Sequence, residues 1–387
     1  MDFRIELGVL ETFVLYASTV VIATLLAAHS KKVRVANTET YRNLSSIFIL
    51  SFVVLALPLI FRASGVDNEG YLEMYREISM WNGNFLQNYR GFPEPLFMLL
   101  NYFVIVTTDN FQFVYIISGI ISLFFLYKAF KRKIEELDPG ILIWLFSSTL
   151  YFYMYGLVRM LIAVSIMTYA LHYLENRNIK KYLVWGLIAG FFHYSAFIII
   201  PIFVVISLVS SNKSVKFNLF KSALISIVVI PSIFTIGMIV FKSLFYNFAW
   251  FGRYSKYFNF DNINIQVLKN IVWILPLFVI LIVYGKYIEK HMSSFKLHAN
   301  LLFVMLTIAL LSVFFGVQRL LFYIYPSVFY LYTSFIRLPF IASDKNSVKL
   351  FYWLGMLFMG NLWLFNVVIG GENWRDFMVP YIFHILR

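Results

Sequence analysis

Long apolar runs separated by short polar loops dominate the chain, and they predict membrane-spanning helices. An α-helix needs about 20 mainly apolar residues to cross a bilayer. Because the runs are continuous rather than alternating, they favour helices over strands. We therefore expect a single all-α polytopic integral membrane domain over residues 1–387, with about 12 transmembrane helices. The expected spans are 8–28, 43–61, 111–127, 140–156, 159–174, 182–192, 195–209, 219–241, 268–288, 298–315, 319–337 and 349–369.

Several of these runs are too short to cross a bilayer cleanly. Residues 95–108 are apolar but short, and a crossing there would put the basic cluster at 128–133 outside, so we expect a re-entrant or interfacial helix. Residues 140–174 and 182–209 must each go out and back, which predicts breaks near Gly156 and at Phe192-His193-Tyr194-Ser195. Non-helical backbone at membrane depth is tolerated only where it is buried in protein or lines a wet cavity. The broken helices therefore indicate a functional cavity.

Composition and charge agree with a membrane protein and fix its orientation. The chain is 61% hydrophobic and only 13% charged, which excludes a soluble globular domain. The net charge of +13 does not indicate nucleic acid, because the basic residues lie in short loops between spans, as the positive-inside rule requires. These loops place both termini outside. They also leave two outer loops, 62–110 with the re-entrant helix and 242–267, an aromatic-rich segment that could act as a lid and carries Arg253.

The residue inventory excludes several kinds of chemistry. The chain has no cysteine, which removes disulfides, thiolate metal sites and cysteine nucleophiles. No CxxC, HExxH or Walker-type glycine loop occurs, so we expect no cofactor and no metal site. Asp67 and Glu69 form an Asp-x-Glu pair in the first outer loop that could bind a divalent cation or a sugar hydroxyl, but such spacing is common by chance.

Two arginines lie in the same small pattern, Gly156-Leu157-Val158-Arg159 and Gly316-Val317-Gln318-Arg319. A charge at membrane depth costs a few kcal/mol and marks a functional-site candidate. The guanidinium of arginine can bind a phosphate through two parallel hydrogen bonds. Both residues also lie near expected helix N-termini, where the helix dipole favours an anion. The alternative is one snorkelling arginine and one helix-packing ion pair. We predict an outward-facing cavity that binds a phosphate or pyrophosphate, with Arg253 as a further ligand.

Three residues are candidates for proton transfer. His193 lies at the outer break of residues 182–209, and the ordinary pKa of histidine suits a general base. The alternative is a histidine satisfied by a neighbouring tyrosine. Glu94 stands between Pro93 and Pro95, which hold it on a stiff turn. This rigidity suits a positioned carboxylate, and the alternative is a solvated loop acid. Glu94 and Asp67 are the second candidates for the catalytic base.

These residues together resemble a known family. The motifs are Asp67 with Tyr71, Glu94-Pro95-Leu96-Phe97, Arg159 running on into Ala170-Leu171-His172-Tyr173-Leu174, Leu187 to Phe197 with its Phe-His-Tyr-Ser-Ala core, and the late Arg319. In this order they resemble the EpsG-like branch of Wzy-type polysaccharide polymerases, over roughly residues 60–335. One departure is that Asp67-Asn68-Glu69 replaces a Gly-Thr-Asp-like run.

The resemblance implies a metal-independent membrane glycosyltransferase of GT-C-like architecture. It implies a substrate of undecaprenyl-diphosphate-linked oligosaccharide repeat units, joined on the outer face of the bacterial cytoplasmic membrane. Expected partners are this lipid-linked saccharide, the bilayer and a chain-length regulator protein, with no nucleic acid. The product could be O-antigen, capsule or exopolysaccharide. The alternatives are an O-antigen-type ligase, a transferase using a polyprenyl-phosphate sugar, and a lipid-linked oligosaccharide flippase or transporter.

Overall fold

All apolar runs expected between residues 8 and 209 form helices in the computed structural model of the protein. The structure describes residues 4–30, 33–34, 41–42, 45–63, 65, 67–81, 84–89, 93–210, 222–224, 226–228, 231–232, 275–292, 294–313, 316–336 and 381–384. The expected spans at 219–241 and 349–369 and the outer loop at 242–267 with Arg253 lie largely or wholly outside these residues.

The described elements are nearly all helical, as the apolar pattern predicted. Their bounds are β1 (Arg4–Glu6), α1 (Val9–His29), β2 (Val33–Arg34), β3 (Tyr41–Arg42), α2 (Ser45–Ile60), α3 (Asn68–Ser79), α4 (Phe85–Asn88), α5 (Pro95–Thr107), α6 (Gln112–Lys131), α7 (Pro139–Thr149), the 3₁₀ helix η1 (Tyr151–Tyr155), α8 (Val158–Glu175), α9 (Ile179–Phe192), α10 (Ala196–Ser210), α14 (Leu275–His291), α15 (Phe295–Leu311), the 3₁₀ helix η4 (Gln318–Tyr323), α16 (Tyr325–Ile336) and β4 (Ile382–His384).

Two expected helix breaks are confirmed. The run at 140–174 divides into α7, η1 and α8, with Gly156 and Leu157 between the last two. The run at 182–209 divides into α9 and α10, and His193 lies in the break. Local sequence explains where α7 begins. The Asp138 side chain caps the helix by accepting hydrogen bonds from the N–H groups of Gly140 and Ile141, and Pro139 occupies the first helical position.

One expectation about helix starts is wrong. Arg319 does not begin an α-helix: it lies in the 3₁₀ helix η4, and α16 starts only at Tyr325. Gly316 and Val317 precede η4 just as Gly156 and Leu157 precede α8, but the second segment closes in the tighter 3₁₀ form. The two similar sequence patterns therefore build two different backbones.

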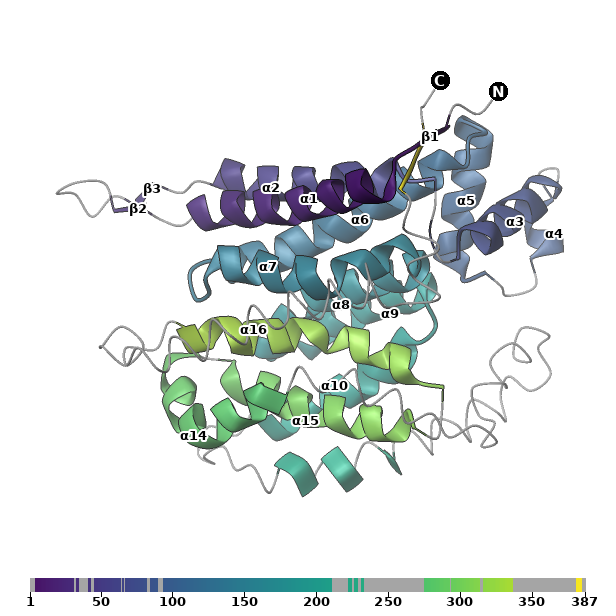
Figure 1. Cartoon of the computed structure of the whole chain (residues 1–387). Coiled ribbons are helices and arrows are strands. Elements are labelled where there is room, and N and C mark those ends of the chain that lie inside the picture. The colour runs from purple at the N-terminus through teal and green to yellow at the C-terminus, as the bar shows by residue number, and fades with distance from the viewer. Residues whose placement is uncertain are drawn as a thin grey trace.

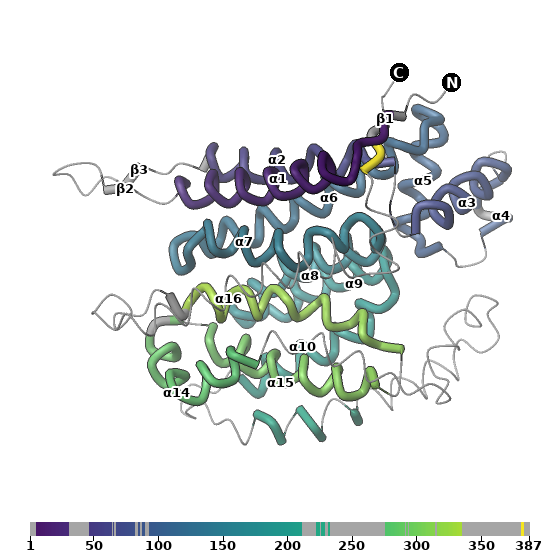
Figure 2. The backbone as a smooth tube through the Cα atoms, in the orientation of Figure 1, coloured from purple at the N-terminus to yellow at the C-terminus, as the bar shows by residue number. Residues whose placement is uncertain are grey.

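Helix α8 forms the centre of the bundle. It is buried along most of its length and packs against α6 on one side and α9 on another. The helices lie in layers, with α1 and α2 at one side, α7, α8 and α9 in the middle, and α10, α14, α15 and α16 beyond (Figure 1). The tube view in Figure 2 shows the same layering along the chain.

The outer helices expose apolar side chains. Leu10 on α1, Phe124 on α6 and Ile282 on α14 are among those facing outward. A large exposed apolar surface is what a bilayer, rather than water, accommodates. Among the described helices, α1 and α6 are long and apolar enough to cross a membrane by length and composition. The protein is thus a helical membrane protein, while the number of about 12 spans stays a prediction.

One end of the bundle holds both termini. Strands β1 and β4 pair antiparallel, so the two ends of the chain lie side by side, as the expected placement of both termini on one side requires. Helices α3, α4 and α5 stand at this same end, and the β2–β3 hairpin lies at the opposite end (Figure 1). Residues 62–110, expected to form an outer loop with a re-entrant helix, are thus mainly helical, and the position of α5 relative to a membrane stays a prediction.

Candidate active site

Three distant segments bring Glu94, Arg159 and His193 together. Glu94 directly precedes Pro95 at the start of α5, Arg159 lies in the first turn of α8, and His193 occupies the break between α9 and α10. The Arg159 Nη1 atom forms an ion pair with Glu94 Oε2, and His193 Nδ1 lies 3.0 Å from Glu94 Oε1. We call these three residues the outer cluster. All three were sequence candidates, and the structure joins them through one carboxylate.

The outer cluster is partly open at both of its basic side chains. Glu94 is fully buried, whereas Arg159 and His193 keep 18% and 13% of their side chains exposed. His193 Nδ1 faces the carboxylate but lies off the line of a good hydrogen bond, and Nε2 has no hydrogen-bond partner among the described residues. Catalytic hydrogen bonds often tighten only when substrate binds. The ring therefore has one nitrogen next to a carboxylate and the other available.

Electrostatics keep Glu94 ionised. Burial alone raises the pKa of this carboxyl, but the charges of Arg159 and His193 and the contact with His193 outweigh burial and lower the pKa to about 2. The backbone N–H of Tyr194 also points at Oε1 from 3.4 Å. A carboxylate with such a low pKa stays ionised near neutral pH, and it contacts both basic side chains of the cluster.

Tyr71 connects Asp67 to the outer cluster. The Tyr71 side chain hydrogen-bonds with Arg159, and the guanidinium lies 5.8 Å from the centroid of the Tyr71 ring. Asp67 stands at the N-cap position of α3, one turn before Tyr71, and is near enough to act on the tyrosine electrostatically. Asp67 thus reaches the cluster through a neighbour.

A hydrogen bond holds the Arg319 segment beside the His193 break. Tyr323, the last residue of η4, lies 2.9 Å from Ser195 through the two hydroxyl oxygens, and η4 also packs against α8. The Arg319 side chain is exposed at the other end of η4. The structure therefore brings the second arginine to the same region, but on a surface rather than inside the cluster.

A third arginine, Arg62, is buried near the cluster and was not predicted from the sequence. Arg62, just after α2, is buried and donates to the carbonyls of Leu59 and Met154. Its guanidinium lies 4.3 Å from the Tyr115 ring centroid and 5.1 Å from that of Tyr155. The sequence does indicate a candidate here, because Arg62 directly follows the apolar run 43–61. Its contacts tie α2 to η1 and α6, next to the start of α8.

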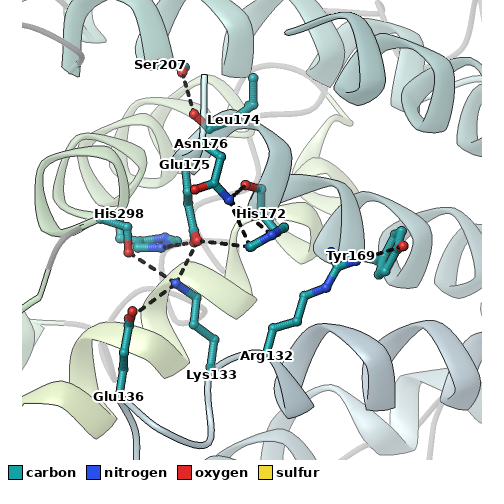
Figure 3. A network of polar contacts seen from close by, with 11 residues as sticks. Arg132, Lys133, Glu136, Tyr169, His172, Leu174, Glu175, Asn176, Ser207 and His298 are labelled. Atoms are coloured by element: carbon teal, nitrogen blue, oxygen red, sulfur yellow. Dashed lines mark hydrogen bonds and ion pairs between the residues drawn. The ribbon is translucent and has the colours of Figure 1, made fainter. Parts of the chain in front are cut away.

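A second buried ionic network lies at the other end of α8 (Figure 3). Lys133 Nζ contacts Glu175 Oε2 at 2.7 Å, and His298 Nε2 contacts Glu175 Oε1 at 2.9 Å. The remaining ring nitrogen of His298 lies 3.0 Å from the Ser327 hydroxyl. We call Lys133, Glu175 and His298 the inner cluster. The sequence analysis placed Lys133 in a basic cluster between spans and proposed no role for any of the three residues.

Neither cluster has the composition of a metal site. Within the described part of the chain, no group of three or more His, Asp or Glu side chains is arranged to hold a metal ion. Asp67 is the N-cap residue of α3 and Glu69 lies in its first turn; Glu69 is exposed and Asp67 half-buried. The outer cluster instead combines one carboxylate, one guanidinium and one imidazole, a set suited to proton transfer and to binding an anion.

Comparison with known proteins agrees with the motif order. A model of the EpsG family matches residues 46–383, which include Glu94, Arg159, His193 and Arg319. No curated protein and no solved structure matches the chain. The resemblance drawn from the sequence motifs is confirmed. The chain belongs to the EpsG family, which assigns it to polysaccharide biosynthesis as a helical membrane protein with glycosyltransferase-like polymerase activity.

Proposed function

We propose that the protein polymerises undecaprenyl-diphosphate-linked oligosaccharide repeat units on the outer face of the bacterial cytoplasmic membrane. The observation that carries the proposal is the outer cluster: a buried carboxylate that contacts His193 Nδ1 and Arg159 while His193 Nε2 stays available. This arrangement suits a transfer to a sugar hydroxyl with loss of a diphosphate. Family membership supports polymerisation as the overall reaction.

In the proposed reaction, His193 is the general base. The acceptor hydroxyl oxygen attacks the anomeric carbon of the donor sugar, and its proton passes to His193 Nε2. The bond between the anomeric carbon and the diphosphate oxygen breaks, and the electron pair leaves with the diphosphate. Glu94 is a positioning residue: its carboxylate orients the ring through Nδ1 and stabilises the imidazolium that forms. Its pKa of about 2 is why His193, rather than Glu94, takes the proton.

Two arginines stabilise the leaving diphosphate in this proposal. Arg159 lies beside the base, and Arg319 extends from η4, which Tyr323 ties to Ser195. Positive charge placed where negative charge develops is usually the largest catalytic contribution. Asp67 orients Arg159 through Tyr71, and Arg253 binds the second lipid-linked unit. The chain-length regulator stays a prediction.

The test is polymer length and rate with the purified protein and purified lipid-linked repeat units. We expect Arg159→Ala to lower the rate about 10²- to 10³-fold, as loss of a transition-state donor does. Because that variant removes the permanent cation beside the buried Glu94, Arg159→Lys is measured as well. Lysine keeps the positive charge but cannot form two parallel hydrogen bonds, so we expect this variant to fold normally and to react slowly. Arg319→Ala is expected to lose less, because its side chain is exposed.

The matched control is Arg132→Ala, which removes an exposed arginine stacked on Tyr169 at the opposite end of α8. We expect normal polymerisation from this variant. Wild-type rates from both Arg159→Ala and Arg319→Ala in folded protein would show the diphosphate assignment to be wrong.

A further inference from the structure

Four aromatic rings form a continuous strip around α4. Phe85 is its centre: the ring centroids of Trp81, Tyr89 and Tyr102 lie 5.9, 6.1 and 5.3 Å from that of Phe85. The Phe85 and Tyr89 rings are nearly parallel, at 2°. All four side chains are half-buried, so the rings support one another and still present surface. We call these four residues the aromatic strip.

The sequence around the strip is neutral and rich in amides. Residues 81–89 read WNGNFLQNY, with three aromatic side chains, four amides and no charged residue. Asn84, Gln87 and Asn88 are exposed in the structure. In a chain with a net charge of +13, a neutral surface of this kind is not suited to an anion. It suits a ligand with apolar faces and many hydroxyl groups.

The strip leads directly to the outer cluster. The Tyr89 hydroxyl donates to the carbonyl of Pro93 at 3.0 Å, one residue before Glu94. Tyr89 also hydrogen-bonds with the side chain of Tyr194, the neighbour of His193. The Tyr194 backbone N–H in turn faces Glu94. A ligand lying along the strip would therefore end at the candidate base.

We propose that the aromatic strip is a subsite for the neutral pyranose rings of the saccharide, an inference that rests on the proposed function. The C–H faces of a pyranose are apolar and stack on aromatic rings, while its hydroxyls bond to amide groups such as those of Asn84 and Asn88. The strip holds sugars beyond the reacting residue, so it governs how firmly the chain stays bound between transfers. Its occupant is the glycan and not the lipid.

The test measures binding of fluorescently labelled fragments, a few repeat units long, released by mild acid from the polysaccharide of the producing strain. Phe85→Ala is the main variant, because Phe85 contacts the other three rings. We expect about tenfold weaker binding, which is the loss of roughly one good aromatic contact. The matched control is Phe103→Ala, which removes an aromatic side chain on α5, next to Tyr102 in sequence, that is 58% exposed and outside the strip. We expect no change from this variant.

Both measurements are repeated in a His193→Gln background, which separates the two proposals. Phe85→Ala should still weaken fragment binding about tenfold relative to that background, although polymerisation is lost. If Phe85→Ala binds fragments as tightly as wild type, or if Phe103→Ala weakens binding equally, the subsite is overturned whatever the polymerisation assay shows. Binding that falls steeply with added salt would also overturn it, because a neutral sugar is not held by screened charges. If the protein binds fragments through Phe85 but joins no repeat units, the subsite stands and the proposed function fails.

Discussion

Helix α8 carries a buried ionic cluster at each end, and the two are built from the same kinds of side chain. Each centres on one buried carboxylate that contacts one permanent cation and one histidine: Glu94 with Arg159 and His193 in the outer cluster, and Glu175 with Lys133 and His298 in the inner one. The more exposed Glu136 and His172 lie at the edge of the inner cluster, 3.5 Å from Lys133 and 4.0 Å from Glu175. Arg159 and Glu175 are separated by 16 residues of helix, or about 24 Å. Composition alone does not distinguish the two clusters.

The two clusters differ in how many hydrogen-bonding positions of the histidine ring are already occupied. His298 is fully buried, and its two nitrogens contact Glu175 and Ser327. Lys133 also reaches Ser294, so the inner cluster is closed and satisfied (Figure 3). His193 is partly exposed, and its Nδ1 lies 3.0 Å from Glu94 without a well-formed hydrogen bond. Buried ionic groups occur both in structural networks and at functional sites. Burial and charge are similar in the two clusters. The unused hydrogen-bonding capacity of the histidine is what distinguishes the candidate functional site from the structural network.

Exchanging the two histidines for glutamine gives the largest expected contrast. His193→Gln is expected to lower the polymerisation rate about 10²- to 10⁴-fold, because the amide cannot take a proton. His298→Gln is expected to keep the rate per folded molecule, because its ring lies at the other end of α8. The measurements are initial rates with lipid-linked substrate and the melting temperature of each variant. Equal loss of activity in the two folded variants would remove the distinction between an open and a closed cluster.

The sequence predicted the members of the outer cluster but not their contacts. Local signals singled out each member: proline on both sides of Glu94, the glycine before Arg159 and the helix break at His193. The structure brings these three residues together, and their catalytic roles stay predictions. The ion pair of Glu94 with Arg159 joins residues 65 apart, and no local pattern encodes which carboxylate meets which arginine.

The inner cluster escaped prediction for a related reason. Lys133, Glu175 and His298 each follow or begin an apolar run beside other polar loop residues, where solvated charges are ordinary. Their burial arises only when α6, α8 and α15 pack together. Similarly, Arg319 shares the local pattern of Arg159 yet lies on a 3₁₀ helix, because packing against α8 and α15 decides how that segment closes.

Breaking the inner cluster should cost stability rather than catalysis. Glu175→Gln leaves the buried Lys133 with only the exposed Glu136, 3.5 Å away, as an ionic partner, and the loss of the buried pair is expected to destabilise the protein by about 3 kcal/mol or more. The double variant Lys133→Met with Glu175→Leu removes both charges and should recover most of that loss. The measurement is the free energy of unfolding by denaturant in a fixed detergent.

A less buried ion pair provides the control for that experiment. Lys296 and Glu289 lie 3.3 Å apart with about a fifth of each side chain exposed. Glu289→Gln is expected to cost about 1 kcal/mol or less. A single Glu175→Gln variant that loses no more than this control would mean that Lys133 has other compensation, and the inner cluster would lose its structural role.

Acid should lower the free energy of unfolding through the outer cluster, by no more than the loss expected from Glu175→Gln. The folded-state pKa of Glu94 is about 2, below its ordinary value of 4.5, so the folded protein binds this proton less readily than the unfolded chain does. The resulting stability is fully present above about pH 4.5 and is lost as the pH falls towards 2.

The lowering of the Glu94 pKa corresponds to about 3 kcal/mol of folding free energy. Subtracting the unfolding curve of Glu94→Gln from that of wild type cancels the carboxylates outside the cluster, so the difference should fall as the pH drops from 4.5 towards 2. The control Glu77→Gln removes an exposed acid on α3 and should give a flat difference throughout. A Glu94→Gln difference that is equally flat would show that Arg159 does not hold this carboxylate ionised, and the outer cluster would then lack the fixed negative charge on which the role of His193 depends.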